Sequence, residues 1–284
     1  MTTPYTPTAT LAYRRIIHPS DFSDDSHTGL VHAVKLALAL RGELSIMHVD
    51  PDVANADFED FPKVRPILEQ WGLLPPGSHR TAVGQLGITI KKSRTAAKNP
   101  TEGILQYLGK HPADLLVMST HQYEGLARWQ HQTVAEPVAR ETQTATLFVP
   151  THVEGFVAKN SGESTLRRVL VPVSPTGSPQ LAINTTAQLA TALGCDNLTV
   201  IVMHVGDDKT FQSIRYPSRE GWLWHSITCQ GNLVDGILGM GADFDVDLIV
   251  MTTAQQHSLL DLMRGNVTEC VLRGARSPLL AIPA

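Results

Sequence analysis

Asp114-Leu115-Leu116-Val117-Met118-Ser119-Thr120 returns 133 residues later as Asp247-Leu248-Ile249-Val250-Met251-Thr252-Thr253. In both segments an acidic residue precedes four apolar residues, and hydroxyl residues follow them. A short continuous apolar run is typical of a central parallel strand that is covered on both faces. The correspondence keeps its spacing to the end of the chain, where Val134, Glu136, Val138, Arg140 and Pro150 recur as Val267, Glu269, Val271, Arg273 and Pro283. The sequence therefore contains two copies of one unit.

The correspondence also extends toward the N-terminus, with a different spacing. Arg14-Arg15-Ile16-Ile17-His18-Pro19 recurs as Arg167-Arg168-Val169-Leu170-Val171-Pro172 at a spacing of 153, and Met47-His48-Val49 recurs as Met203-His204-Val205 at a spacing of 156. Because the spacing then drops from 156 to 133, the second copy is shorter in its middle. Residues 50–87 of the first copy largely lack a counterpart in the second.

Apolar runs and helical periodicities alternate along each copy, which predicts alternating strands and helices. In the first copy the expected strands begin at Ile16 and cover 44–49, 87–91, 115–118 and 146–149, and the expected helices cover 30–38, 134–140 and a stretch that begins at Asn99-Pro100-Thr101-Glu102. That last motif places a capping Asn before a first-turn Pro, with Glu three residues after the cap. Short connections between such elements imply right-handed crossovers and a parallel sheet.

The chain length of 284 residues suits two domains. We expect a flexible Thr- and Pro-rich leader at residues 1–12, a first domain at 13–150, a polar linker at 151–165 and a second domain at 166–284. The expected fold class is α/β, in two tandem domains.

Composition excludes several classes of protein. Apolar residues make up 42% of the chain, charged residues 18%, and the net charge is only -4, with Lys and Arg scattered along the sequence. This pattern is not that of a nucleic-acid-binding patch or a membrane-surface face, and no apolar run reaches the length of a membrane span. The three cysteines have no C-x-x-C spacing, which argues against a disulfide framework and favours the reducing cytoplasm.

Together these motifs resemble the universal stress protein family. The resemblance rests on the opening strand that runs into Pro19-Ser20-Asp21-Phe22-Ser23, on a second strand that ends in His-Val, on Asp-Leu-Ile-Val-Met, and on a final Pro-Leu-Leu-Ala-Ile-Pro strand. It implies a Rossmann-like, five-stranded, mainly parallel sheet between helices in each domain, and a role in stress tolerance rather than defined catalysis. It also implies pairing through the last strands, so we expect residues 146–150 and 278–283 to pair within the chain as a pseudo-dimer. A homodimer and an unidentified protein partner stay open.

One branch of that family binds ATP through Gly, two residues, Gly, nine residues, and then Gly followed by Ser, Thr or Asn. Glycine suits these positions because the backbone must approach phosphate oxygens and offer N–H groups to them. The corresponding positions are Ser119, Gln122, Gln132 and Thr133 in the first copy, and Thr252, Gln255, Gly265 and Asn266 in the second. Of the glycine positions only Gly265 is retained, and Asn266 follows it, so ATP is possible there but not favoured.

The same branch places an aspartate near the nucleoside, after the first strand. The first copy keeps it as Asp21, whereas the second copy has Ser174. Each copy therefore lacks a different part of the pattern. The candidate nucleotide-binding residues are Gly265, Asn266, Thr252 and Asp21.

Histidines near the predicted carboxyl edge of the first sheet suggest a second kind of site. His18, Asp21 and His48 follow neighbouring strands, and two histidines with a carboxylate could hold zinc or iron, or serve a hydrolytic site. We favour a hydrogen-bonded crevice over a metal site. For His48 and His204 we favour a packing role, because the His-Val pair recurs in both copies.

The remaining candidates have structural interpretations. His121, Tyr123, Trp129 and His131 lie in the loop that replaces the phosphate cradle, where we expect side chains to fill the space; Gln255, Gln256 and His257 lie in the equivalent loop of the second copy. Trp222 and Trp224 alternate as on a strand, so we expect both indoles on one face, in an apolar contact between the copies. Cysteines 195, 229 and 270 have no basic neighbours that would lower their pKa, so we expect inert thiols.

The leading interpretation is a tandem universal stress protein that acts as a stress-response binding or regulatory module, without the family's usual ATP binding and without catalysis. The second interpretation is weak ATP binding or slow hydrolysis at one degenerate site, most plausibly in the second domain. The third is the metal-dependent or hydrolytic site around His18, Asp21 and His48.

Overall fold

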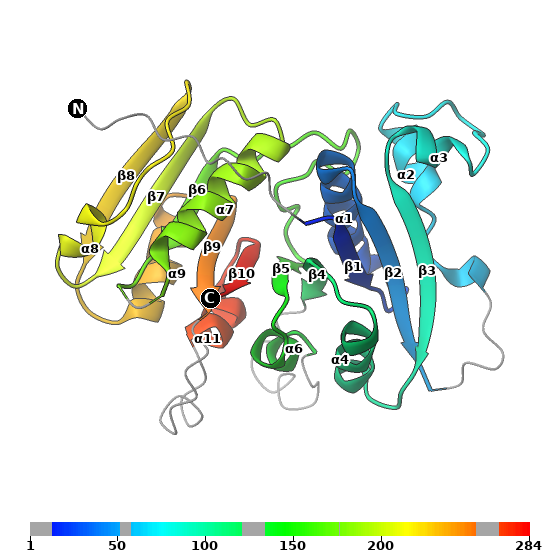
Figure 1. The fold of residues 1–284 in the computed structure, drawn as a ribbon, viewed down its shortest axis with the longest axis horizontal. Coiled ribbons are helices and arrows are strands. Elements are labelled where there is room, and N and C mark those ends of the chain that lie inside the picture. The colour runs from blue at the N-terminus through cyan, green and yellow to red at the C-terminus, as the bar shows by residue number, and fades with distance from the viewer. Residues whose placement is uncertain (1–12, 52–57, 121–133, 176, 254–266) are drawn as a thin grey trace. The chain divides into compact units, whose positions relative to one another are not determined.

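The computed structural model describes residues 13–51, 58–120, 134–175, 177–253 and 267–284. The described chain divides into two compact units, Tyr13–Glu163 and the residues from Ser164 onward (Figure 1). We call these the first and the second unit. Within the described ranges, every helix is too short or too polar to cross a membrane.

The first unit is an α/β fold with a five-stranded parallel sheet. Its strands lie in the order β3-β2-β1-β4-β5, and each neighbouring pair is parallel. In chain order its elements are β1 (Arg15–Pro19), η1 (Asp24–Ser26), α1 (His27–Leu40), β2 (Glu43–Asp50), η2 (Phe58–Asp60), α2 (Val64–Gln70), α3 (Ala82–Gln85), β3 (Thr89–Ala96), α4 (Pro100–Lys110), β4 (Leu115–Thr120), α6 (Ala135–Glu141) and β5 (Ala145–Pro150).

The second unit repeats this sheet, with strand order β10-β9-β6-β7-β8 and parallel pairs. Its elements are β6 (Arg168–Pro172), α7 (Pro179–Ala192), β7 (Leu198–Val205), α8 (Lys209–Gln212), β8 (Trp222–Cys229), α9 (Leu233–Asp243), β9 (Leu248–Thr253), α11 (Val267–Gly274) and β10 (Leu279–Pro283). The predicted fold class is confirmed in both units.

The direction of the crossovers decides where a ligand could bind. The chain runs from β1 to β2 in one direction across the sheet and from β3 to β4 in the other. Because both connections are right-handed, α1 covers one face and α4 covers the opposite one. The strand order therefore reverses between β1 and β4, and open α/β sheets bind ligands outside the carboxyl ends of the strands at such a switch point.

The aspartate that opens each repeated motif fastens the first strand of its unit. Asp114 Oδ2 accepts the backbone N–H groups of Arg14 and Arg15, at 3.0 and 2.8 Å. Asp247 Oδ2 accepts those of Arg167 and Arg168, each at 2.7 Å. These bonds explain why both copies carry an aspartate directly before the central strand.

Helix α4 of the first unit and its counterpart α9 of the second unit each begin at an asparagine N-cap. Asn99 Oδ1 accepts the N–H groups of Thr101 and Glu102, at 2.9 and 3.4 Å, and Pro100 occupies the first turn, as predicted. In the second unit Asn232 caps α9 in the same way, at 2.8 and 3.2 Å from its two donors. A side-chain oxygen at this position satisfies N–H groups that the helix leaves unpaired.

The segment expected to be a polar linker, residues 151–165, is packed against the first unit as far as residue 163. Phe156 and Val157 are fully buried there. Trp71 donates its indole N–H to the carbonyl oxygen of Lys159 at 2.9 Å. Gly162 has a φ of 68°, and its missing Cβ would lie 2.4 Å from the Trp71 ring.

Trp71 belongs to the segment that the second copy largely lacks. Through Trp71, the extra segment thus packs against residues 155–163 at the end of the first unit.

Candidate functional site

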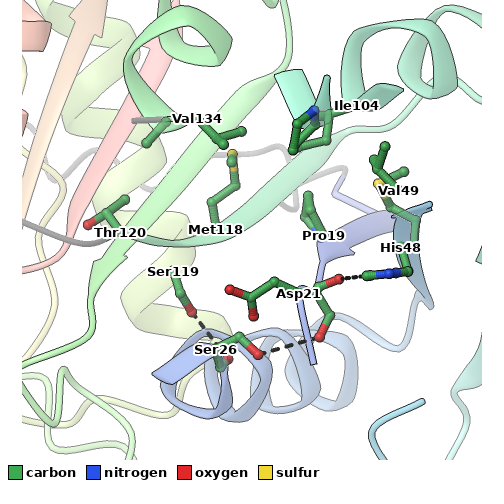
Figure 2. A pocket seen from close by; sticks show the side chains of 14 residues that line it. Pro19, Asp21, Ser26, His48, Val49, Ile104, Met118, Ser119, Thr120 and Val134 are labelled. Atoms are coloured by element: carbon green, nitrogen blue, oxygen red, sulfur yellow. Dashed lines mark hydrogen bonds between the residues drawn. The ribbon is translucent and has the colours of Figure 1, made fainter. Parts of the chain in front are cut away.

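A cavity of about 310 Å³ opens at the carboxyl ends of β1, β2 and β4 in the first unit (Figure 2). It lies at the switch point in the strand order, where the fold predicts a ligand site. Apolar and hydroxyl side chains surround it, together with one carboxylate and one imidazole. The lining residues are Pro19, Ser20, Asp21, Ser26, Met47, His48, Val49, Pro100, Ile104, Met118, Ser119, Thr120, Val134 and Ala135.

Asp21 is the acidic residue of this lining and follows directly after β1. Its Oδ1 accepts the backbone N–H of Ser23 at 3.0 Å and the Ser23 hydroxyl at 2.6 Å. Figure 2 shows Asp21 between Ser119 on one side and His48 on the other. The sequence prediction that Asp21 stands at the carboxyl edge agrees with this placement.

His48 is held by the loop after β1. Its Nδ1 donates to the carbonyl oxygen of Ser20 at 2.6 Å. In the second unit, His204 Nδ1 donates to the carbonyl oxygen of Val173 at 2.9 Å. Because the same bond recurs in both units, the histidine ties its strand to the first loop, as the packing interpretation proposed.

His18 is completely buried and is not part of the cavity lining. Its Nδ1 donates to the carbonyl oxygen of Val117 at 2.9 Å. Burial lowers its pKa from the ordinary 6.5 to about 4, although the bond to Val117 acts in the opposite direction. The ring is therefore neutral at physiological pH.

The structure does not bring His18, Asp21 and His48 together as metal ligands. Across the described ranges, no three His, Cys, Asp or Glu side chains lie close enough to hold a metal ion.

The first position of the phosphate pattern carries a hydroxyl that bonds to the backbone in both units. Ser119 Oγ donates to the carbonyl oxygen of Ser26 at 3.1 Å and accepts the N–H of Gly29 at 3.2 Å. Thr252 Oγ1 donates to the carbonyl oxygen of Gly177. Each hydroxyl thus fastens the central strand to the start of the first helix of its unit.

The other predicted cradle positions lie outside the described residues. These are Gln122, Gln132, Thr133, Gln255, Gly265 and Asn266, together with the loop residues His121, Tyr123, Trp129, His131, Gln256 and His257.

The tryptophans of β8 make hydrogen bonds within the second unit, and the apolar contact between copies stays a prediction. Trp222 Nε1 donates to the carbonyl oxygen of Cys195, and Trp224 Nε1 to that of Pro217, each at 2.9 Å. The Tyr216 ring lies 5.4 Å from that of Trp224. Alternation on a strand shows that two indoles share a face, but it does not show which segment covers them.

The buried thiol among the cysteines is not activated. Burial raises the pKa of Cys195, which keeps it protonated. Cys229 lies with its Sγ 3.5 Å from the Met240 sulfur. Both environments agree with the expectation of inert thiols.

The sequence did not predict the residues that pack around Phe22, next to Asp21. Phe22 stacks on His48 with ring centroids 4.0 Å apart, and Phe61 and Arg94 lie against Phe22. Phe22 follows Asp21 in the quoted motif, and that adjacency was the available signal. Phe61 and Arg94 gave none, because they come from the extra segment and from β3.

The comparisons with known proteins fit this geometry. A family model described as the universal stress protein family matches residues 12–150 and 224–283. No curated protein matches the chain.

Solved structures also resemble it over nearly its whole length. A universal stress protein from Archaeoglobus fulgidus is 14% identical, with a TM-score of 0.61 over 95% of this chain and 97% of that one. A Pseudomonas aeruginosa protein named for the same family is 15% identical, with a TM-score of 0.60 over 96% and 94%. A further Pseudomonas aeruginosa protein, of unknown function, is 13% identical, with a TM-score of 0.56 over 96% and 93%. At these identities the likeness shows the fold.

Proposed function

The chain belongs to the universal stress protein family, and on that premise we propose that it is a stress-response binding module whose first unit takes up a small ligand beside Asp21. The observation that carries this proposal is the cavity at the switch point of the first sheet, with the exposed Asp21 carboxylate in its lining. A volume of about 310 Å³ is near the lower limit for small-molecule pockets.

The chemistry of the lining supports binding rather than catalysis. The Nδ1–H of the His48 imidazole bonds to the carbonyl oxygen of Ser20, and among the described residues no hydrogen bond joins this ring to a hydroxyl nucleophile or a carboxylate. The Ser119 hydroxyl bonds to the carbonyl oxygen of Ser26. A nucleophile needs a neighbouring base that can take its proton, whereas the hydrogen bonds that His48 and Ser119 donate go to backbone carbonyl oxygens.

The lining also favours a ligand without phosphate charge. Among the described residues around the cavity there is one aspartate and no lysine or arginine. A triphosphate beside Asp21 would meet a like charge, whereas a nucleoside could donate hydrogen bonds to the carboxylate and pack against Met118 and Ile104. We therefore propose a nucleoside such as adenosine as the ligand class.

A pairing of the two domains through their last strands remains a prediction from the family resemblance. The same holds for a homodimer, for a cytoplasmic location and for ATP at Gly265 and Asn266 of the second unit.

The test is a thermal shift with adenosine and, separately, with ATP and Mg²⁺. A ligand at 100 times its dissociation constant stabilises the folded state by about 2.7 kcal/mol, which raises the midpoint by several degrees. We expect adenosine to produce this rise, Asp21→Ala to abolish it, and the matched Ser174→Ala variant of the second unit to leave it in place. A rise with ATP and Mg²⁺ that survives Asp21→Ala would instead favour the site in the second unit.

A further inference from the structure

The residue that follows Asp21 has an unusual backbone conformation. Phe22 has a φ of 65°, in the left-handed region that bulky side chains seldom adopt. Such a conformation persists only where the surroundings hold it, and it is most often found at ligand sites and switches. What holds Phe22 therefore bears on what Asp21 does.

Three side chains surround the Phe22 ring. His48 stacks on it at 4.0 Å with an interplanar angle of 18°, and Phe61 meets it edge-on at 5.0 Å. The Arg94 guanidinium lies 5.6 Å from the Phe22 ring and 5.5 Å from the Phe61 ring. We call these four residues, Phe22, His48, Phe61 and Arg94, the aromatic clamp.

The aromatic clamp is itself fixed from outside the loop. The Arg94 side chain is only 7% exposed, and it forms ion pairs with Asp50 at 2.9 Å and Asp60 at 3.4 Å. Phe61 is 1% exposed and follows η2, in the segment that the second copy largely lacks. The extra segment of the first unit thus contributes directly to the support of the Asp21 loop.

The second unit has no way to form this arrangement. Counting from the shared Arg-Arg, the position of Asp21 is taken by Ser174 and that of Phe22 by Pro175. The proline ring fixes φ near −65°, so Pro175 is barred from the left-handed conformation of Phe22. The carboxylate and the backbone geometry that presents it are absent together.

We propose that the aromatic clamp is a positioning device for the ligand site: it holds Phe22 in its left-handed conformation and so sets the direction of the Asp21 carboxylate. The hydrogen bonds from Ser23 to Asp21 then complete a rigid loop. This inference rests on the proposed function, because the purpose of the device is to present Asp21 to a nucleoside. Phe22 and Phe61 act through Asp21 and are positioning residues.

The experiment compares Phe61→Leu with a matched control, Phe211→Leu, whose ring lies edge-on to His204 at 6.2 Å in the second unit. The first measurement is the ¹⁵N order parameter of the Ser23 amide in ligand-free protein, and the second is adenosine affinity by calorimetry. We expect Phe61→Leu to lower the order parameter from about 0.85, typical of rigid backbone, toward 0.6. We also expect it to weaken adenosine binding about tenfold, while Phe211→Leu changes neither.

Two further variants keep the test decisive if Phe61→Leu does not fold. Phe22→Gly removes the ring but tolerates a positive φ, so the fold should survive while the Ser23 amide loosens. Phe22→Tyr keeps the ring and should keep both order and affinity. A merely structural role would lower the thermal midpoint in step with affinity; positioning predicts an affinity loss out of proportion to the midpoint.

The outcomes separate the two proposals. An unchanged Ser23 order parameter in both Phe61→Leu and Phe22→Gly overturns the aromatic clamp, whatever the affinity. A loosened Ser23 in protein that does not bind adenosine supports the clamp and rejects the ligand class proposed above.

Discussion

The two units keep the same backbone ties but differ in the loop that follows their first strand. In both units an aspartate accepts two backbone N–H groups, a histidine Nδ1 donates to a loop carbonyl, and a hydroxyl bonds at the start of the first helix. Only the first unit adds Asp21 and a left-handed Phe22. The bonds to backbone groups are thus shared by both units, whereas Asp21 and the left-handed Phe22 are found only in the first.

This difference teaches that fold and site can diverge separately within one chain. The repeated bonds use side chains to satisfy backbone groups, so their loss would cost stability in either unit. The second unit has Ser174 and Pro175 in place of Asp21 and Phe22, and it still forms its sheet. Function therefore has to be argued from each site and not from the shared fold.

The largest expected effect comes from a matched pair of tryptophans. Trp71 and Trp222 are each 8% exposed, and each donates its indole N–H to a carbonyl oxygen at 2.9 Å. Replacing either with alanine removes a large buried ring and leaves a cavity, so we expect a loss of about 3–5 kcal/mol in each case. Urea denaturation measures the loss, and hydrogen exchange shows where it falls.

The location of the exchange tests whether the units are separate. Trp71→Ala should speed exchange in residues 155–163 of the first unit, and Trp222→Ala should speed it around Cys195 in the second. Leu223→Ala is the control, because this side chain is 58% exposed. If either tryptophan variant loosened both units equally, the comparison of independent units would be wrong.

Acid should act on the first unit through two buried histidines, His18 and His32. Burial lowers the pKa of each to about 4, while the unfolded chain titrates near 6.5. Because the folded pKa is the lower one, the stability is present above pH 6.5 and is lost as the pH falls toward 4. At pH 4 each histidine therefore lowers the free energy of unfolding by about 3 kcal/mol relative to neutral pH.

The second unit supplies the substitution that tests this. The second unit carries Val171 at the position of His18. The variant His18→Val therefore places the residue of the second unit in the first and removes one titrating group. We expect the loss of stability between pH 7 and pH 4 to shrink by about 3 kcal/mol, as measured by urea denaturation at each pH. An unchanged loss would mean that His18 does not drive the acid response.

Much of the fold could be predicted because its signals are periodic and occur twice. The apolar run before Ser119 and the Asn99 cap each depend on neighbours in sequence, so spacing alone revealed them. Asp21 could be placed at the carboxyl edge because a parallel sheet brings the ends of its strands together.

The rest depends on contacts between distant segments that leave no local pattern. Phe61 and Arg94 reach Phe22 from the extra segment and from β3, and the sequence offers no spacing that links them. The sequence predicts a polar linker at residues 151–165, because one Phe-Val pair is too short to show a period. Their packing follows from Trp71, which lies about 90 residues earlier.

The smallest expected effect concerns the asparagine caps, and it is also the strictest comparison of the two units. Asn99 and Asn232 each accept two N–H groups at the start of an 11-residue helix, with nearly equal distances. Replacing either with alanine should cost about 1 kcal/mol, and replacing it with aspartate or serine should cost less, because an oxygen acceptor remains. Urea denaturation of the single and double variants measures both losses. Since the caps belong to different compact units and share no hydrogen-bond partner, the losses should add. A markedly unequal pair would show that the two units do not gain the same stability from the same cap.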